Sequence, residues 1–516
     1  MSKLSVRQIM KRHEQAQMRK DNWRQIYEDC YEFALPQRNL YDGYYEGGGS
    51  PGQNKMARVF DSTAINATQR FANRIQAGLF PPYGQWCRLE PGPDIPADRA
   101  IEAQAILDAY SEKMFAVLRQ SNFDLAMGEF LLDLSVGTAV MLVQPGDEIT
   151  PIRFTAVPQY LVCIEEGANG KVDNVYRRMR IKAEAITQHW TDAEVGERLQ
   201  RIIDEKPTEE VELVEATIYD ADSGEFCYHV IWPEGEHELL KRYMKSSPWI
   251  VARYTKVAGE VYGRGPLVTA IPDIKTLNKT LELLLKNASL SIAGVYTVAD
   301  DGVINPQTIR IAPGAVIPVA RNGGPQGESL RMLPRSGDFN VSQIVINDLR
   351  MNIKKIMLDD TLPPDNMSAR SATEVAERMK ELAQNLGSAF GRLITETMVP
   401  MVSRILYVMD ERGLIEMPLK VNGLEVKVSP VSPIAQAQNL GDIEKIMNWV
   451  QLSAGLGPEG QMAVRTGSIS DYVADKLGIP AELRTSPAER QQMMEQAQQA
   501  AMMAAQAEGM MPAEGE

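Results

Sequence analysis

Two long amphipathic segments that border a turn-rich insert constrain the fold of this chain more than any other feature. After Gly263-Arg264-Gly265-Pro266, one apolar stripe predicts a continuous helix and consists of Ile274, Leu277, Leu281, Leu284, Ala288 and Ile292. Beyond the insert, a second stripe predicts another helix and consists of Val345, Leu349, Ile353 and Ile356. An antiparallel pair of such helices leaves its outer faces open. We therefore expect neighbouring copies of the chain, in a closed ring, to bury them.

Basic residues accompany both stripes. Lys275, Lys279 and Lys286 recur at steps of four and seven, so they share one helix face. The second segment adds Arg350, Lys354 and Lys355. Against them stand three acidic residues, in a chain whose formal net charge is −14. In a ring these positions would form circles of positive charge that touch phosphates without gripping them, although lysines on helices are as often only a solvated face.

The remaining pattern predicts an α+β chain that is mainly helical. The first segment is helical up to Pro36, and a second helix runs from Asp61 to Phe80. Strands are predicted in the middle, at 138–143, 152–154, 160–162, 211–214 and 228–232, with a turn at 220–224. A capping box at Ser371 predicts a very long helix that continues almost to Gly413 and is kinked at Pro400.

The composition and motifs exclude several classes of protein. The acidic total argues against a chain that grips nucleic acid with its whole surface. The four cysteines lie far apart, without metal-site spacing, and the four histidines form no H-E-x-x-H. The loop at 47–55 lacks the Gly-Lys-Ser/Thr of a phosphate loop. His189 beside Trp190 is more typical of packing than of catalysis. We expect no cofactor, no metal, no catalytic centre, no signal peptide and no membrane helix.

Several local blocks resemble the portal, or head-to-tail connector, proteins of tailed bacteriophages, most of all those of short-tailed phages. They are Trp23-Arg24-Gln25-Ile26-Tyr27 with Ala34-Leu35-Pro36, Phe60-Asp61-Ser62-Thr63-Ala64, Leu79-Phe80-Pro81-Pro82 with Trp86, and Tyr262-Gly263-Arg264-Gly265-Pro266. The resemblance covers roughly residues 1–430. It is weaker over the C-terminal 86 residues.

The resemblance implies a portal fold with a wing, a two-helix stem, a β-rich clip and a helical crown. The wing would comprise residues 1–266 together with a long helix and return strand at 371–430. The stem helices would be 267–293 and 341–358, on either side of a clip at 294–340. Residues 359–370 would be the tunnel loop. Residues 431–516 would be the crown with a disordered acidic tail.

The resemblance also implies site residues and partners. The six basic stem residues would line a DNA channel. The tunnel loop would use Thr361, Pro363, Pro364, Asn366, Met367, Ser368 and Arg370, and the clip would bind partners through Arg321, Asn322, Gly323, Gly324 and Gln326. Twelve copies would form a ring at a capsid vertex, assembled in the host cytoplasm. Its partners would be double-stranded DNA, terminase, tail or adaptor proteins, the major capsid protein and scaffold, with no membrane.

Two other classes of function remain open from the sequence. One is a cytosolic helical scaffold or adaptor that assembles without DNA passage. The other is an enzyme whose catalytic residues are dispersed along the chain, although no local motif such as G-x-S-x-G points to one. A ring with a central hole would distinguish a portal from both.

Overall fold

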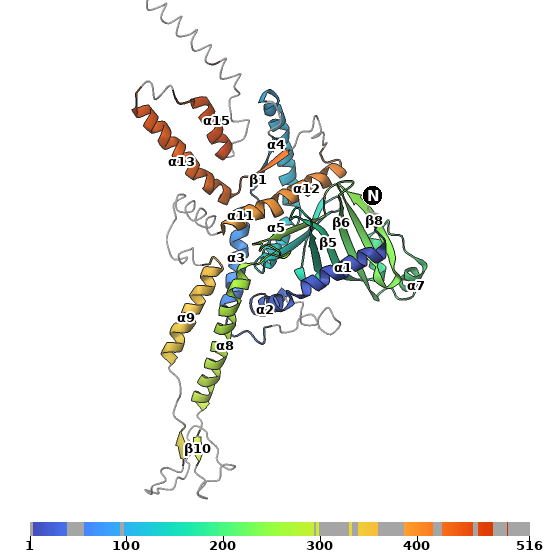
Figure 1. Ribbon diagram of the computed structural model, residues 1–516, viewed down its shortest axis with the longest axis vertical. Helices are drawn as coiled ribbons and strands as arrows, with labels where there is room; N and C mark the ends of the chain where they lie inside the picture. Colours follow the sequence, from blue (N-terminus) through green and yellow to red (C-terminus); the bar gives the residue numbers. More distant parts are fainter. Residues whose placement is uncertain are drawn as a thin grey trace, which may run out of the picture.

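The chain folds into a body of helices and sheets from which two long helices extend (Figure 1). The computed structural model describes residues 4–38, 56–92, 97–293, 296–298, 330–332, 339–359, 386–415, 426–457, 463–477 and 493. The mixed, mainly helical architecture is the one that the sequence predicts.

The largest sheet of the described residues is antiparallel, with strand order β4-β5-β6-β7-β8. Its strands are Val162–Glu166, Val172–Lys182, Glu210–Asp220, Glu225–Trp232 and His237–Met244. The predicted turn at 220–224 joins β6 to β7, and Gly224 adopts a φ of +71° there. Successive residues of β6 face opposite sides of the sheet. Ala216 and Ile218 pack under helix α1, whereas Leu213 packs on the other face.

Helices cover both faces of this sheet. Helix α1, Val6–Asp21, lies across one face and begins with a capping box between Ser5 and Gln8. Two short helices, α6 (Ala183–His189) and α7 (Glu197–Glu205), pack on the other. The N-terminal helical segment of the sequence is thus divided, because α1 ends at Asp21 and α2 (Arg24–Ala34) begins three residues later.

A smaller antiparallel sheet, of order β3-β2-β9, forms the centre of the body. Its strands are Ile152–Val157, Thr138–Pro145 and Trp249–Arg253. The central strand β2 is buried on both faces: Ala139, Met141 and Val143 join the main core, whereas Val140 and Leu142 face the larger sheet.

Helices α3 (Thr63–Leu79), α4 (Ala97–Gln120) and α5 (Phe123–Leu134) surround the main core. An aromatic cluster holds them together, in which Trp86 stacks on Phe123 and meets Phe80 and Phe115 edge-on. Next to it, β1 (Cys87–Pro91) pairs with β12 (Val426–Pro430), so backbone hydrogen bonds join two segments that lie far apart in the sequence.

The two extended helices are α8, Pro266–Ala293, and α9, Phe339–Ile356, and we call them the projecting pair. Their bounds lie close to the predicted 267–293 and 341–358. They pack side by side, and two three-residue strands, β10 (Tyr296–Val298) and β11 (Leu330–Met332), pair beyond them. The predicted stripe of α9 is shifted, since Val345 is exposed and Ile346 is buried. The reason is that α9 packs against α3 as well as α8, which rotates its buried face.

Three glycines join the projecting pair to the body, and we call them the glycine junction (Gly137, Gly263 and Gly265). A Cβ on Gly137 would lie 2.1 Å from the carbonyl oxygen of Gly263, and one on Gly265 would lie 2.0 Å from that of Ser135. The N–H groups of Gly265 and Leu267 donate to the carbonyls of Val136 and Ser135, at 2.9 and 3.1 Å. The start of α8 therefore meets residues 135–137, the turn that leads into β2, backbone to backbone, which only glycine permits.

The irregularity expected at Pro400 takes the form of a π-helical turn, Ile394–Met398, between α11 (Ser388–Leu393) and α12 (Val399–Glu411). Proline has no N–H to bond the carbonyl of Glu396, so the chain widens by one residue just before it. The predicted portion of this helix from 371 to 385 lies outside the described residues. Two further helices, α13 (Pro433–Gly455) and α15 (Thr466–Leu477), lie on the side of the body opposite the projecting pair (Figure 1).

Candidate functional site

The basic residues of α8 are largely paired with acids. Lys275 reaches Asp29 of helix α2, with 2.7 Å between the ammonium nitrogen and the carboxylate. Lys279 and Lys286 share one partner, Glu282, at 2.9 and 2.5 Å. Hydrogen bonds from Lys286 and Lys279 lower the pKa of Glu282 to about 2, so this carboxylate stays ionised at any physiological pH. One positive charge therefore remains from this trio.

Arg350 of α9 connects the projecting pair to the body. Its guanidinium lies 2.7 Å from the carboxylate of Asp61, which also accepts the backbone N–H of Thr63 at the start of α3. Burial raises the pKa of Asp61, but hydrogen bonds from Thr63 and Arg350 outweigh it and leave that pKa below its ordinary value. Arg350 thus has a structural partner as well as any role in a channel.

Lys354 and Lys355 are exposed and have no ion pair among the described residues. They lie in the last turn of α9, which ends in a Schellman arrangement: Leu358 is left-handed, with a φ of +56°, and the N–H of Asp359 donates to the carbonyl of Lys354 at 2.7 Å. The buried carboxylate of Asp359 faces Arg70 and Arg74 of α3, at 3.4 Å each. The end of α9 is therefore surrounded by basic side chains.

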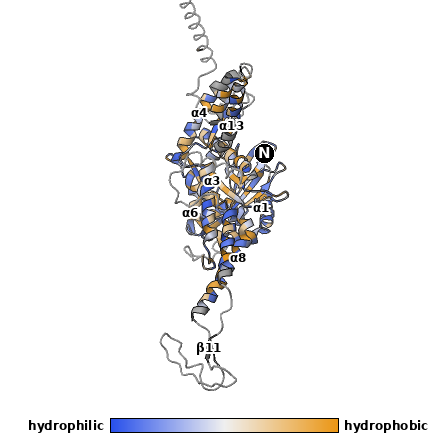
Figure 2. Ribbon diagram, turned by 90° about the vertical axis from the view of Figure 1, so that its left-hand side faces the viewer, coloured by the Kyte–Doolittle hydropathy of each residue, from blue (hydrophilic) through white to orange (hydrophobic). Residues whose placement is uncertain are grey.

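The outer faces of the projecting pair also carry large apolar side chains. Leu283 and Leu285 of α8 are 55% and 51% exposed, and Ile344 and Met351 of α9 are 62% and 67% exposed. Figure 2 shows α8 extending from the body with hydrophobic and hydrophilic residues along its length. A single copy of the chain leaves these side chains in water, and that costs hydrophobic free energy which an interface would recover.

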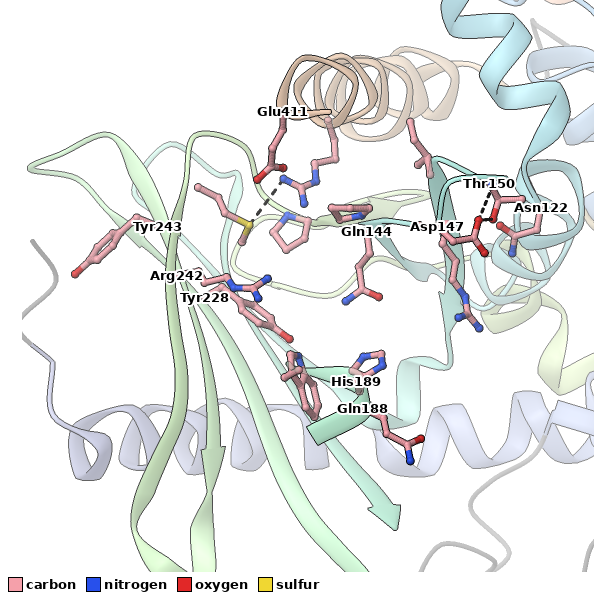
Figure 3. Close-up of a pocket in the computed structure, with 18 residues that line it drawn as sticks. Asn122, Gln144, Asp147, Thr150, Gln188, His189, Tyr228, Arg242, Tyr243 and Glu411 are labelled. Carbon is pink, nitrogen blue, oxygen red and sulfur yellow. Dashed lines mark hydrogen bonds between the residues drawn. The ribbon is translucent and has the colours of Figure 1, made fainter. Parts of the chain in front are cut away.

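A cleft of about 930 Å³ opens between the two sheets and helix α12. Figure 3 shows Gln144, Gln188, His189 and Tyr228 along it, with Glu411 on the opposite side. Burial lowers the pKa of His189, whose ring packs edge-on against Trp190 with 4.5 Å between centroids. In the described part of the chain, the His189 ring has no hydrogen-bond partner that could orient it as a general base. Packing is the better account of His189.

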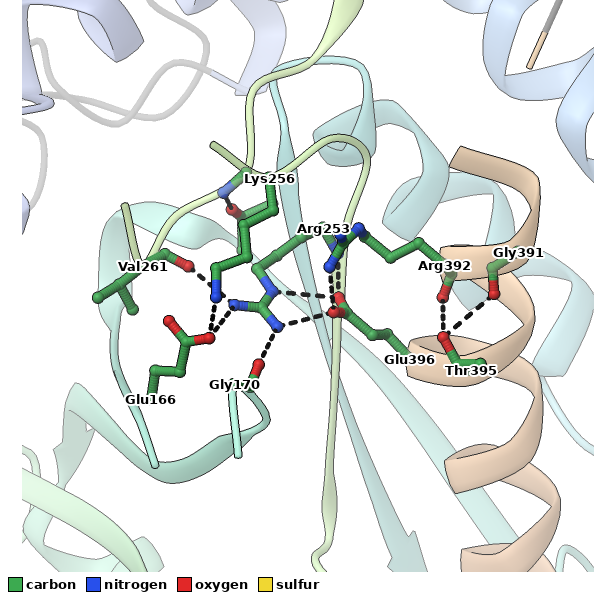
Figure 4. Close-up of polar contacts among 11 residues, drawn as sticks. Glu166, Gly170, Arg253, Lys256, Val261, Gly391, Arg392, Thr395 and Glu396 are labelled. Carbon is green, nitrogen blue, oxygen red and sulfur yellow. Dashed lines mark hydrogen bonds and ion pairs between the residues drawn. The ribbon is translucent and has the colours of Figure 1, made fainter. Parts of the chain in front are cut away.

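An ion network lies between the two sheets and the π-helical turn (Figure 4). Buried Arg253 of β9 donates to Glu396 from its backbone N–H, its Nε and its terminal nitrogen, at 3.0, 3.1 and 2.7 Å. The same guanidinium also reaches the backbone carbonyls of Gly170 and Val261, while Glu166 pairs with Lys256. No sequence pattern indicates this network, because its members come from distant segments. It fixes the π-helical turn to both sheets.

Within the ranges that the structure describes, no three His, Cys, Asp or Glu side chains gather as metal ligands. No helix in those ranges is long and apolar enough to cross a membrane. The four cysteines, all buried, are free thiols.

A family model described as "Bacteriophage head to tail connecting protein" matches residues 6–484 of this chain. The chain belongs to this family. The connector is similar to the probable portal protein of Bordetella phage BPP-1, with 22% identity over 92% of this chain and 88% of that protein. It is also similar to the portal protein of Escherichia phage T7, at 24% identity over 76% and 73%. A third relative is the portal protein of Salmonella phage epsilon15, at 22% identity over 82% and 77%.

Two solved structures are also similar to the connector. They are titled "Virion of native gene transfer agent (GTA) particle" and "Neck of empty GTA particle computed with C6 symmetry". Both have a TM-score of 0.33, and their identities are 14% and 13%. They cover 80% and 77% of this chain, and 93% and 91% of their own.

The structure brings some of the sequence-predicted residues of the connector together and leaves others apart. Lys279 and Lys286 meet at Glu282, while Lys275 pairs with Asp29 of α2 and Arg350 pairs with Asp61, just before α3. All the tunnel-loop residues named above, from Thr361 to Arg370, lie outside the described residues. So do the clip residues, from Arg321 to Gln326.

Sequence reasoning missed two arginines, Arg70 and Arg74, that approach the end of α9. A signal for them was present, because α3 contains these two arginines and no Asp or Glu across its 17 residues. In a chain with 68 acidic residues, a helix without any is unusual.

Proposed function

We propose that this connector is a portal subunit, one of twelve copies in a ring at a single capsid vertex. The ring conducts double-stranded DNA into the capsid with a separate terminase, retains it, and releases it into the tail. It contacts the major capsid protein and scaffold on one side and tail or adaptor proteins on the other. The ring assembles in the host cytoplasm and its role is structural rather than catalytic.

The projecting pair is the observation that carries this proposal. Its inner face is buried against the body, while Leu283, Leu285, Ile344 and Met351 stay exposed on one copy. In a ring, the α8 of one subunit faces the α9 of the next, and this head-to-tail contact closes on itself. The basic residues of the pair then repeat around a central opening, where they contact phosphates without reading sequence.

The proposal divides the chain into the parts of a portal. The projecting pair acts as the stem, and the body, with residues 1–266 and 371–430, acts as the wing. The clip at 294–340 lies at the far end of the stem, where tail or adaptor proteins dock. The tunnel loop would comprise residues 359–370, after the basic end of α9. The crown would comprise residues 431–516, and its helices α13 and α15 lie on the side of the body opposite the stem.

Oligomeric state and shape test the proposal. Native mass spectrometry and negative-stain imaging of the purified chain should give a closed ring of twelve with a central hole. A stable monomer or a filament at micromolar concentration contradicts a portal, and a solid assembly without a hole favours the scaffold alternative.

A substitution at the outer face locates the contact. Met351→Asp should abolish rings, because burying an unpaired carboxylate in the subunit contact costs several kcal/mol. Met18→Asp is a matched control, since Met18 of α1 is equally exposed and belongs to the body. Loss of rings with unchanged circular dichroism supports the contact, whereas rings that persist in Met351→Asp contradict it.

A further inference from the structure

One exposed surface of the molecule carries amides and cations but no carboxylate. Helix α3 exposes Asn66, Gln69, Arg70 and Asn73 at helical spacing. None of its residues is acidic, although the chain as a whole has a net charge of −14. The side-chain amide of Gln69 donates to that of Asn73 at 3.2 Å, and Asn66 has no side-chain partner in the described part of the chain.

Helix α9 extends this surface. It runs alongside α3 in the same direction, because Arg350 pairs with Asp61 before the start of α3 and Asp359 pairs with Arg70 and Arg74 farther along. The flank of α9 next to α3 carries Gln343, Asn347 and Lys354, at three- or four-residue steps around Arg350. Gln343 donates to Asn347 at 3.3 Å, and both are exposed.

Carboxylates at the two ends of this surface are covered. The side chains of Asp61 and Asp359 are 6% and 2% exposed, and arginines lie over both. Asp348, the one acidic residue within α9, lies seven positions before Lys355 and so shares that face, away from Lys354. What remains toward solvent is a patch of one lysine, one well exposed arginine and several amides, which we call the α3–α9 surface (Asn66, Gln69, Arg70, Asn73, Gln343, Asn347 and Lys354).

We propose that the α3–α9 surface binds the phosphate backbone of double-stranded DNA as it passes the ring. This rests on the proposed portal function and adds residues of α3 to the DNA contact. Guanidinium, ammonium and amide N–H groups all donate hydrogen bonds to phosphate oxygens, and none of them selects a base. The surface thus suits a duplex of any sequence in transit.

The chemistry of the surface favours DNA over a second copy of the chain. Contacts between subunits bury apolar side chains, and Ile344 and Met351 supply those on the neighbouring face of α9. The α3–α9 surface has no large apolar residue among the seven that define it. The face of α9 with Ile344 and Met351 would therefore contact the neighbouring subunit, and the face that belongs to the α3–α9 surface would contact DNA.

Amide-to-acid variants test the assignment with almost no change in shape. Asn66→Asp adds a carboxylate to the surface, and Arg70→Gln removes a cation while Arg74 still covers Asp359. Gln15→Glu on the exposed side of α1 is the control. Fluorescence anisotropy of assembled rings with a labelled 30-base-pair duplex, taken over a salt series, measures the affinity and its salt dependence.

We expect Asn66→Asp and Arg70→Gln each to weaken duplex binding roughly five- to tenfold near 0.1 M salt. The slope of log affinity against log salt should fall by about 0.9 for each phosphate that a variant no longer neutralises, whereas Gln15→Glu should match the parent ring. Rings that bind duplex equally well in all variants overturn the α3–α9 assignment and leave the portal function intact. Loss of rings in Asn66→Asp makes the surface a subunit contact and overturns it too. A parent ring that binds no duplex at all contradicts the proposed function itself.

Discussion

The body and the projecting pair treat their charges in opposite ways. In the body, Arg253 is buried and donates three hydrogen bonds to Glu396, and its two terminal nitrogens also reach two backbone carbonyls and the carboxylate of Glu166. In the projecting pair, Glu282 holds Lys279 and Lys286 in two pairs that remain largely in solvent. A buried pair cannot lose one member without exposing the other to an apolar interior, whereas solvent replaces a missing partner at the surface.

The difference between buried and solvent-exposed ion pairs indicates different roles for the two regions. The body fixes geometry, because its buried charges are held by several partners on different elements at once. In the projecting pair, the ammonium groups of Lys279 and Lys286 stay near solvent, as the proposed contact with a passing polyanion requires. Removing charges one at a time in the two regions therefore tests the distinction.

The largest effect is expected at Glu396. Glu396→Ala removes the nearer of the two carboxylates beside the buried guanidinium of Arg253 and leaves only Glu166, at 3.6 Å, so it should destabilise the body by about 3 kcal/mol. Chemical unfolding followed by tryptophan fluorescence measures it. Glu282→Ala is the counterpart in the projecting pair and should leave the unfolding midpoint nearly unchanged. Equal losses of stability for the two variants would show that the contrast between the regions is wrong.

Lowering the pH should also affect the body selectively. Burial, with added repulsion from Arg178 and Lys20, lowers the pKa of His13 to about 4, below its ordinary 6.5. The unfolded chain then binds a proton that the folded one does not, so stability is full above pH 6.5 and falls as the pH drops toward 4. The loss of stability is about 3 kcal/mol at most.

Replacing the histidine isolates this contribution. His13→Phe keeps a ring beside Tyr176, whose centroid lies 5.8 Å away, and should flatten the pH dependence between 6.5 and 4. Glu282, with its pKa of about 2, stays ionised throughout that window, so contacts of the projecting pair should not respond. The measurement is the unfolding midpoint at half-unit pH steps, and a profile unchanged by His13→Phe argues against the buried neutral ring.

A smaller effect, of opposite sign, is expected for Glu282→Gln. The change frees Lys279 and Lys286 from their shared carboxylate and adds one net positive charge per subunit. Rings should bind duplex more tightly at low salt, roughly three- to tenfold, and with a steeper salt dependence. Glu184→Gln, at an exposed position of α6, serves as control. If duplex binding does not rise, the α8 lysines do not reach the DNA.

The smallest expected change separates the two lysines at the end of α9. Lys354→Ala should reduce the salt slope of duplex binding by about 0.9 or less, because it removes one cation from the α3–α9 surface. Lys355→Ala, on the face shared with Asp348, should have little effect, and so should Lys11→Ala on α1. A stronger response from Lys355 than from Lys354 would transfer the DNA contact to the opposite flank of α9.

Periodicity in the sequence was enough to place both helices of the projecting pair to within two residues at each end, since their stripes are long and regular. It could not place the partners of their charges. Asp61 lies 289 positions from Arg350, and Asp29 lies far from Lys275 in the chain, so only the fold brings them together. The exposed Val345 shows the same limit. Which face of α9 is buried depends on all the helices that pack against it, and the sequence of α9 alone does not indicate that α3 is one of them. Buried Arg253 went unnoticed for the same reason.

The glycine junction has a mechanical consequence. Three glycines let the first turn of α8 lie directly on the backbone of residues 135–137, the turn before β2, with hydrogen bonds from Leu267 to Ser135 and from Gly265 to Val136. A contact between side chains can adjust by a change of rotamer, whereas this contact between two backbone segments has no side chain that could move. A pull on α8 would therefore act on the turn at 135–137 and, through it, on β2, which is hydrogen-bonded on both edges, to β3 and β9. We therefore expect the junction between α8 and the body to act as a rigid joint rather than as a hinge.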